Sequence, residues 1–236
     1  MDFFERQWGT YRTVLSHDLM EHRAVEQATA TALEHWLGAR PPEASPARMV
    51  DLGCGDLALL APLLRRLPLG SYTGVDLTAA VLPLAEQNLG VVPYPVHWEA
   101  GDLLQWANTA QESSAKPVEI LHSAFAIHHL TDPQKASFLQ AARACIADNG
   151  LFLWVDVFRE PGETREAYLA RYSARVQGWT ALEGPQQEQV IQHLSQCDIP
   201  ADREAIVEVA RQAGWHWRWS WQGRHQAEAM AVLTPA

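Results

Sequence analysis

Apolar positions along this chain follow two patterns, one with the period of an amphipathic helix and one typical of buried strands. The buried runs predict seven strands, at residues 48–52, 71–76, 94–98, 118–123, 150–157, 215–221 and 226–233. Helical spacing predicts helices at residues 16–37, 57–67, 78–89, 132–147 and 200–213, with further helical segments from residue 159 onward. Strands that alternate with helices form a mostly parallel sheet with helices on both faces.

The final two predicted strands break this alternation. They are joined at Gln222-Gly223, close enough to pair as an antiparallel hairpin. The expected fold class is therefore α/β, with a doubly wound, Rossmann-like sheet of seven strands and a carboxyl-terminal antiparallel hairpin. We expect one domain over residues 1–236, made of four segments. These are a helical cap at 1–40, a ligand-binding core at 47–157, a helical insertion or lid at 159–200, and a helix with the terminal hairpin at 201–236.

Composition narrows the class of protein. The chain has 236 residues, of which 47% are hydrophobic, enough for a substantial core. A formal net charge of -10 with no clustered basic face argues against a nucleic-acid partner. The beginning of the chain lacks a signal-peptide pattern and no apolar run is long enough to cross a bilayer, so we expect a cytoplasmic protein without a membrane partner. Three widely spaced cysteines, Cys54, Cys145 and Cys197, favour reduced thiols over disulfides or a zinc site.

Four tryptophans, Trp215, Trp217, Trp219 and Trp221, alternate with polar residues near the end of the chain. Strict alternation on a strand predicts that all four point to one face. Such a stripe suits a sheet face packed under helices, and it equally suits a dimer contact or a substrate wall. The sequence leaves these alternatives, including a homodimer, open.

Acidic residues follow three successive predicted strands. Asp51 precedes the turn formed by Gly53 and Gly55, Asp76 ends the next strand, and Asp102 follows the third. Because the carboxyl ends of parallel strands share one edge of the sheet, these side chains line a single crevice. A carboxylate at Asp51 repels a diphosphate and suits an ammonium group, whereas Asp76 lies where an acid meets ribose hydroxyls. The expected ligand is a positively charged nucleoside.

With these motifs the chain resembles the class I S-adenosylmethionine-dependent methyltransferases, of the small-molecule kind known as methyltransferase type 11/12. The resemblance rests on residues 50–55, 72–77, 101–103 and 123–130, and on the terminal hairpin. It implies S-adenosylmethionine as cofactor and S-adenosylhomocysteine as product. One departure is Leu57, which stands where the family often has a third glycine and leaves the local loop shape open.

The same resemblance implies a role for each motif residue. Asp51, Gly53 and Gly55 would surround the methionine part of the cofactor, with Cys54 at the pocket wall. Asp76 would bind the ribose, Leu77 would pack on the adenine, and Asp102 with Leu103 would meet the adenine amine. We add two further cofactor contacts to this set, Ser123 from the fourth motif and Tyr11, which would cap the methionine carboxylate.

A nicotinamide-dependent dehydrogenase is the alternative cofactor class. Gly53, Gly55 and Ala58 satisfy the loose glycine pattern of dinucleotide sites. Asp51 beside the turn, the acid after the third strand and the reversed final strand are features that a diphosphate site does not require. The methyltransferase interpretation is therefore preferred.

His128 and His129 are the candidate catalytic residues, because they follow the fourth strand at the place where a general base would reach the methyl group. They equally suit a structural role at the start of a helix. We expect no metal site, since adjacent residues in a helix or turn diverge and His17 with His22 lack the spacing of one helix face.

Residues that would contact the methyl acceptor come from the fourth motif and the insertion. They are Phe125, Arg159, Tyr168 and Tyr172. Tyr168 and Tyr172 lie four residues apart on one helical face, where aromatic rings and arginines suit a flat or carboxylate-bearing substrate. Packing within a lid explains the same pattern.

The leading functional hypothesis is an enzyme that transfers a methyl group from S-adenosylmethionine to an oxygen or nitrogen of a small metabolite. Two alternatives remain beside it. One is a non-catalytic subunit that keeps the cofactor pocket, and the other is a methyltransferase acting on protein or RNA.

Overall fold

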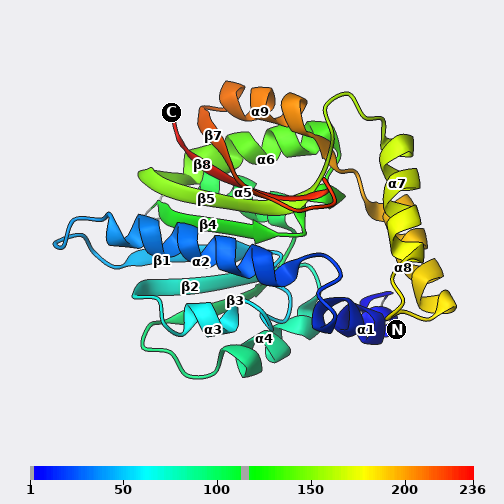
Figure 1. Ribbon diagram of the computed structural model, residues 1–236. Coiled ribbons are helices and arrows are strands. Elements are labelled where there is room, and N and C mark those ends of the chain that lie inside the picture. Colours follow the sequence, from blue (N-terminus) through cyan, green and yellow to red (C-terminus); the bar gives the residue numbers. More distant parts are fainter. Residues whose placement is uncertain (1–2, 113–116) are drawn as a thin grey trace.

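The computed structural model describes residues 3–112 and 117–236. Its centre is a twisted sheet in which five parallel strands are followed by an antiparallel pair (Figure 1). The strands are β1 (Ala47–Leu52), β2 (Leu69–Asp76), β3 (Val96–Ala100), β4 (Val118–Ala124), β5 (Ile146–Arg159), β7 (Trp215–Gln222) and β8 (Glu228–Pro235). They lie in the order β3-β2-β1-β4-β5-β8-β7, and the two-residue strand β6 (Ala201–Asp202) pairs with the end of β5. The predicted fold class, including the terminal antiparallel hairpin, is confirmed.

Helices cover both faces of this sheet and one of its edges (Figure 1). One layer contains α2 (His22–Gly38), α3 (Ala61–Leu64) and α4 (Leu82–Leu89), and the other contains α5 (Leu103–Glu112), α6 (Asp132–Cys145) and α9 (Arg203–Gln212). Short 3-10 turns lie at Ala79–Val81 and Ile127–His129. At the end toward which the parallel strands point lie α1 (Phe3–Ser16), α7 (Arg165–Gln177) and α8 (Gly184–Cys197). This end of the sheet is therefore covered by segments from both ends of the chain.

Two predicted helices differ from the structure. The helix expected at 16–37 is two helices, because Asp18 and Glu21 adopt left-handed φ angles of 56° and 59° that no α-helix can include. The Asp18 carboxylate accepts a hydrogen bond of 2.9 Å from the backbone N–H of Arg23 and fixes the break. The helix expected at 57–67 is reduced to the four residues of α3, since Leu57 has a φ of 57° and residues 58–60 form a turn.

The prediction that four tryptophans share one face is wrong for the last of them. Trp215, Trp217 and Trp219 pack on the α6 and α9 side of the sheet. Between Trp219 and Trp221 the pairing with β8 shifts by one residue, so β7 contains a β-bulge. A bulge reverses the alternation of side chains. Trp221 therefore packs on the opposite, α2 side, against Val25 and Met230 in the cluster that also holds Val155.

A buried ion pair ties α7 to the sheet. The Glu228 carboxylate, fully buried at the start of β8, accepts hydrogen bonds of 2.6 and 2.8 Å from Arg175 and one of 2.7 Å from the Tyr172 hydroxyl. The same guanidinium donates to the backbone oxygen of Leu19 at 2.7 Å, in the connection between α1 and α2. One arginine thus joins the lid, the hairpin and the amino-terminal helices.

Replacing this arginine should destabilise the protein strongly. Arg175→Met leaves the Glu228 carboxylate buried with only the Tyr172 hydroxyl of its present side-chain donors, and loss of one partner of a buried pair costs about 3–5 kcal/mol. Urea denaturation followed by circular dichroism measures the change. As a control, Arg211→Met on α9 removes a pair with Glu208 that lies in solvent, and it should leave the unfolding midpoint unchanged. Equal midpoints for the two variants would contradict the anchoring role.

Candidate active site

A cavity of about 990 Å³ opens at the carboxyl ends of β1, β2, β3 and β4. It is also lined by α1, α2, α8 and the aromatic residues Phe125 and Trp179. Most of the site residues predicted from the sequence line it: Tyr11, Asp51, Gly53, Cys54, Gly55, Asp76, Leu77, Asp102, Leu103, Phe125, His128, His129 and Tyr172. The three acidic strand ends thus meet in one crevice, as the topology requires.

Asp51 is held by two neighbouring strands. Its side chain is almost completely buried, and its two oxygens accept a hydrogen bond of 2.9 Å from the Tyr72 hydroxyl and lie 2.7 Å from Nδ1 of His122. Tyr72 lies on β2 and His122 on β4, the two strands that flank β1. The carboxylate is therefore fixed in orientation while it lines the cavity.

The glycine turn after β1 has the close packing that its sequence predicts. Gly53 has a φ of 76°, and a Cβ there would lie 2.4 Å from the Cβ of Ala126. Gly55 has a φ of 55°, and its N–H donates to the Asp76 carboxylate at 2.9 Å. Leu57, which replaces the glycine frequent in the family, still adopts the left-handed conformation and buries its side chain in the core. Leu57 thus takes a conformation that a glycine would adopt without strain.

Asp76 connects the first two loops of the site. One oxygen accepts from Gly55, and the other accepts from the N–H of Thr78 at 2.8 Å. Burial raises the pKa of Asp76, and these two hydrogen bonds oppose the shift. The next residue, Leu77, has 74% of its surface exposed although it lines the cavity. The site thus presents an exposed apolar side chain, on which a flat ring could pack, next to a carboxylate that accepts hydrogen bonds.

Asp102 caps a helix at the third corner. Its Oδ1 accepts hydrogen bonds of 2.9 Å from the N–H groups of Leu104 and Gln105, at the start of α5. The Asp102 side chain is thereby held at the cavity wall next to Leu103.

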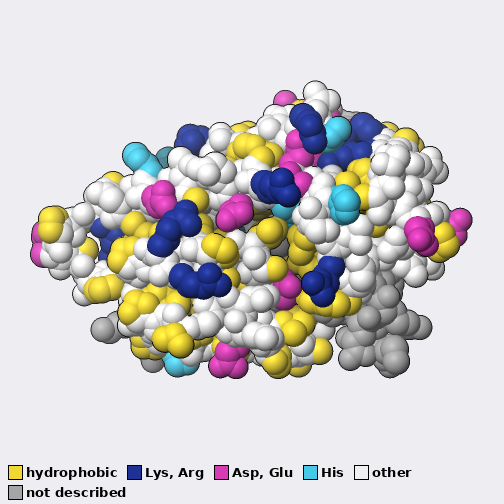
Figure 2. Space-filling view, turned by 60° about the horizontal axis from the view of Figure 1, so that its bottom comes forward, with side chains coloured by type: hydrophobic (Ala, Val, Ile, Leu, Met, Phe, Trp, Pro, Cys, Tyr) yellow, Lys and Arg dark blue, Asp and Glu magenta, His cyan; other side chains and the backbone are white. Residues whose placement is uncertain are grey.

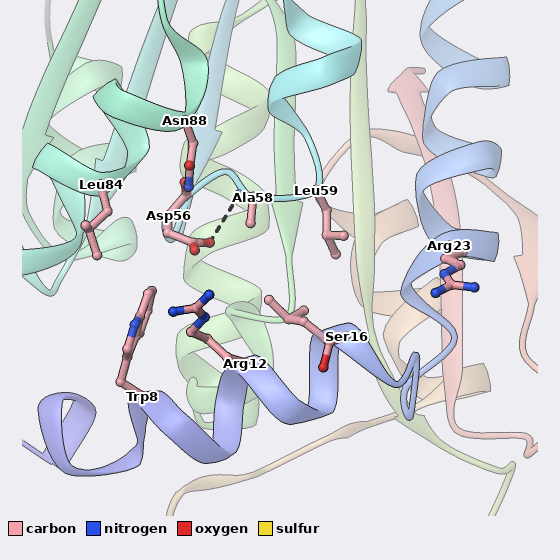
Figure 3. Close-up of a pocket in the computed structure, with 10 residues that line it drawn as sticks. Trp8, Arg12, Ser16, Arg23, Asp56, Ala58, Leu59, Leu84 and Asn88 are labelled. Carbon is pink, nitrogen blue, oxygen red and sulfur yellow. Dashed lines mark hydrogen bonds between the residues drawn. The ribbon is translucent and has the colours of Figure 1, made fainter. Parts of the chain in front are cut away.

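The helix α1 lies between two cavities. Thr10, Tyr11 and Val14 line the large cavity, whereas Trp8 and Arg12 line a smaller one of about 500 Å³ between α1 and the loop at residues 56–59 (Figure 3). In Figure 3 the Arg12 guanidinium points toward Asp56, whose carboxylate accepts from the N–H of Ala58. Burial, followed by the charges of Asp56 and Asp76, raises the pKa of Tyr11. The Tyr11 hydroxyl therefore stays protonated beside the glycine turn and can donate a hydrogen bond.

His128 is enclosed by two carboxylates. Its Nδ1 lies 2.5 Å from Asp156 on β5, and its Nε2 lies 3.6 Å from Asp198 at the end of α8. Burial disfavours the charged ring, but the charges of Asp156 and Asp198 together with the Asp156 hydrogen bond raise the pKa of His128 to about 9. The two carboxylates thus favour the protonated ring, which makes His128 a poorer general base than the sequence suggested.

His129 differs from its neighbour. Its side chain is 43% exposed and lines the cavity, with Nδ1 3.3 Å from the Cys197 carbonyl oxygen. Burial of the ring, followed by the positive charge of His128, lowers the pKa of His129 to about 4. This imidazole is neutral at physiological pH.

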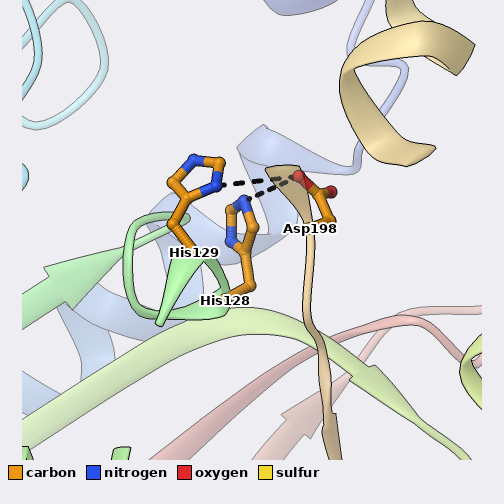
Figure 4. Close-up of side chains that lie close together, drawn as sticks. All are labelled: His128, His129 and Asp198. Atoms are coloured by element: carbon orange, nitrogen blue, oxygen red, sulfur yellow. Dashed lines mark ion pairs between the residues drawn. The ribbon is translucent and has the colours of Figure 1, made fainter. Parts of the chain in front are cut away.

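The two adjacent histidines do not diverge, in contrast to the expectation from the sequence. They lie in a 3-10 turn, where their ring centroids are 4.1 Å apart and both rings face Asp198 (Figure 4). Asp198 is held there through its neighbour Ile199, whose N–H donates to the carbonyl of His128 at 2.8 Å. The buried Lys135 ammonium donates to the carbonyl oxygens of Leu130 and Ile199. The end of α8 is therefore fixed against the turn that follows β4.

Comparison with known sequence families decides the identity. Residues 50–152 match a family described as a methyltransferase domain, over the strands that carry the glycine turn and the acidic residues. This segment is a methyltransferase domain. The predicted family, enzyme class and cofactor are confirmed, and the dehydrogenase alternative is set aside. No curated protein sequence matches the methyltransferase significantly.

Solved structures share this fold at low identity. The plantazolicin methyltransferase BpumL, solved with a triazolic desmethylPZN analog and SAH, gives a TM-score of 0.64 at 12% identity over 95% of this chain and 90% of its own. The N-methyltransferase NodS from Bradyrhizobium japonicum WM9 gives 0.54 at 14%, over 89% and 97%. The cyclopropane synthase MmaA2 from Mycobacterium tuberculosis gives 0.53 at 16% over 80% of this chain, which spans 62% of that protein's length. At these identities the likeness shows the fold.

The residues of the methyltransferase fit S-adenosylmethionine. The exposed Leu77 offers a surface for the adenine, and the half-buried Asp76 beside it offers acceptors for ribose hydroxyls. At Gly55 an added Cβ would meet no atom closer than the Tyr11 hydroxyl, at 3.9 Å, so a ligand can approach this backbone closely. Asp51 and Tyr11 both line this cavity. The Asp51 carboxylate suits the ammonium group of the methionine part, and the protonated Tyr11 hydroxyl suits its carboxylate.

Three predicted site residues lie outside the lining of the cavity. The Ser123 hydroxyl is buried and donates to the carbonyl of Leu52 at 2.8 Å, so it joins β4 to β1. Arg159 donates to the carbonyl oxygens of Pro200 and Glu163 and fixes the entry into the lid. Tyr168 is fully buried and stacks on Tyr172 with ring centroids 5.5 Å apart. These placements give all three a structural role, and the lid-packing explanation holds for Tyr168.

Several residues at the site escaped the sequence analysis. Asp156 and His122 each interrupt an apolar strand, and a charged or polar residue inside such a run is a signal that was available. His193 and Asp198 gave no such signal, because both lie in the lid and Asp198 meets His128 only through the tertiary fold. His22 lines the cavity at the start of α2, with its ring 5.4 Å from Phe125.

Loss of the Asp76 carboxylate should weaken cofactor binding. Asp76→Ala removes the acceptors for the ribose hydroxyls, and hydrogen bonds to a charged group contribute about 1.5–3 kcal/mol, so affinity should fall by about 100-fold. Isothermal calorimetry with S-adenosylhomocysteine measures this loss. The matched control is Asp148→Ala, whose side chain lies in solvent far along the sequence in β5. Unchanged affinity in Asp76→Ala would show that the cofactor site is elsewhere.

Stability should fall in acid partly because of His22. Burial lowers the pKa of His22 to about 4 from the ordinary 6.5. Between these pH values His22 is therefore protonated in the unfolded chain and neutral in the folded protein. The stabilisation is complete above pH 6.5 and is lost toward pH 4, at about 1 kcal/mol per pH unit. Urea unfolding of His22→Leu across this range should show a shallower slope than the wild type. A slope equal to that of the exposed control His35→Leu would contradict the assignment.

Proposed function

We propose that this methyltransferase transfers the methyl group of S-adenosylmethionine to an oxygen or nitrogen atom of a small metabolite. The supporting observation is the single cavity that runs from the acidic strand ends to the lid residues Trp179 and Leu194. Its volume of about 990 Å³ is at the upper end of the range for small-molecule sites, about 300–1,000 Å³. Such a cavity suits a cofactor together with a compact second substrate.

The lining suits a partly apolar acceptor. Phe125, Met20 and Val190 present apolar surface, whereas His129 and His193 present imidazoles. Burial lowers the pKa of His129 and of His193. Both imidazoles are therefore neutral at physiological pH and can orient a hydroxyl or amine by hydrogen bonding. Phe125 has a left-handed φ of 53°, a strained conformation for an aromatic residue that is typical of functional loops.

In the proposed reaction, most of the rate acceleration comes from positioning the methyl acceptor against the methyl group. When bound, S-adenosylmethionine supplies an activated methyl group on a sulfonium with a neutral leaving sulfide. The chain aligns the acceptor between β4 and the lid, and α1 with α8 excludes water from the cavity. Thr10 on α1 donates to Gln189 on α8 at 3.3 Å, so the two covering segments meet. Regions 1–40 and 159–200 act as cap and lid in this proposal.

Charge and thiol chemistry support a metabolite as acceptor and the cytosol as location. On the face that Figure 2 colours, lysine and arginine side chains are interspersed with acidic and hydrophobic ones, which gives RNA no continuous basic surface there. Cys54, Cys145 and Cys197 are free thiols, as is usual in a reducing compartment. Within residues 3–112 and 117–236, no helix combines the length and apolar character that spanning a membrane requires.

Methyl transfer is tested with isotope-labelled S-adenosylmethionine. A cell extract is divided by ultrafiltration into a small-molecule and a macromolecular fraction, and each is incubated with wild-type enzyme and with Asp76→Ala. Label should enter the small-molecule fraction with the wild type alone, and mass spectrometry of the product should place it on oxygen or nitrogen. Label confined to protein or RNA would overturn the proposed acceptor class, and no label in either fraction would favour a non-catalytic subunit.

A further inference from the structure

Ring nitrogens of three histidines converge on one carboxylate oxygen in the cavity. Oδ1 of Asp198 lies 3.6 Å from Nε2 of His128, 3.8 Å from Nδ1 of His129 and 3.6 Å from Nε2 of His193. Figure 4 shows the first two rings on the same side of this carboxylate. His128, His129 and Asp198 can each present a ligand atom so that all of these atoms lie within 4.8 Å of one another.

These separations are too long for hydrogen bonds. Donor and acceptor atoms of a hydrogen bond lie about 2.7–3.2 Å apart. The Asp198 side chain is 97% buried, since 3% of it is exposed, and its Oδ1 has no hydrogen-bond partner among the described residues. A buried carboxylate oxygen without a donor is costly. Ligand atoms bound at about 2.0–2.1 Å around a tetrahedral ion lie about 3.4 Å apart, close to the distances found here.

The surroundings of His128 have the arrangement that supports metal ligands. Its Nδ1 faces Asp156 at 2.5 Å, which directs Nε2 toward Asp198. An ion bound at Nε2 displaces the proton that this nitrogen carries in the ion-free protein. Histidine ligands usually donate their second ring N–H to a carboxylate in this way. Asp156 is itself held by the indole of Trp154 at 3.0 Å and by the N–H of Val157 at 2.9 Å. The hydrogen bonds around Asp156 are thus a second observation in favour of a metal site, separate from the buried Asp198 oxygen without a donor.

We propose that His128, His129 and Asp198 bind a divalent transition-metal ion, with His193 beside the site, where its Nε2 lies 3.6 Å from Asp198. The backbone bond from Ile199 to His128 holds the two contributing segments together before the ion arrives. In the ion-free protein the Cys197 carbonyl accepts a hydrogen bond of 3.3 Å from Nδ1 of His129, and an ion bound at this nitrogen displaces that proton and leaves the carbonyl oxygen at the edge of the site. Imidazole and carboxylate together suit ions such as Zn²⁺, Fe²⁺ or Co²⁺ better than Ca²⁺ or Mg²⁺.

The ion would also give the cavity a chemical function. A hydroxyl or carboxylate of the methyl acceptor would take an open coordination position, and the ion would lower the pKa of a bound hydroxyl. This role rests on the proposed methyl transfer, whereas ion binding itself does not.

Ion binding is tested without turnover by titrating the purified, chelator-treated protein with Co²⁺ and recording its visible absorption bands. Equilibrium dialysis with Zn²⁺ gives the stoichiometry. The wild type should bind one ion and develop the bands of a site with nitrogen and oxygen ligands. His129→Ala and Asp198→Ala should lose affinity by at least about tenfold, and Asp156→Asn by about 10–100-fold. The control His35→Ala, on the exposed side of α2, should bind as the wild type does.

The half-exposed His129 makes His129→Ala the decisive variant, because its substitution leaves the buried core intact. Binding of S-adenosylhomocysteine by each variant, measured by calorimetry, reports on the cofactor site independently. No stoichiometric ion in the wild type, or equal affinity in wild type and His129→Ala, would overturn the metal site. If the wild type did not bind S-adenosylhomocysteine at all, this result would instead count against the methyltransferase function.

Discussion

The position of β1 between two parallel neighbours determines the rest of this structure. β1 pairs with β2 on one side and with β4 on the other, so the connections that follow these strands leave toward opposite faces and open a crevice between them. Asp51 ends up at that point, bound by a side chain from each neighbouring strand. Every other element of the site is placed relative to this crevice, including the glycine turn below it and the histidine turn beside it.

Side chains that bond backbone carbonyls and buried carboxylates attach the covering segments to this framework. Arg175 joins α7 to β8 and to the connection after α1, and Lys135 with Ile199 joins the end of α8 to the turn after β4. These contacts hold charged groups away from water, which is favourable only when each is fully paired. The lid of the methyltransferase is therefore anchored to β8 and to the turn after β4. Its histidines keep fixed positions relative to the strand ends.

The sheet and the position of the crevice could be predicted from the sequence, because apolar runs mark parallel strands and the residues that end them share one edge. The meeting of Asp51, Asp76 and Asp102 at this edge follows from the strand pattern alone. What it could not determine depends on tertiary contacts or on single backbone angles. The break at Asp18 and the bulge before Trp221 each reverse a pattern at one residue, and no periodicity records them. The meeting of Asp198 with His128 joins segments that are distant along the chain.

Leu57 has a consequence for the energetics of ligand binding. A glycine in its place would sample both signs of φ, and the loop would lose that freedom each time a ligand bound. Leucine is held in the left-handed conformation by the burial of its side chain among the residues that support β1. The entropic cost of shaping the loop is thus met during folding, when core packing offsets it. Affinity for the cofactor is in this way coupled to the stability of the hydrophobic core, through a leucine that lines the cavity and packs in the core.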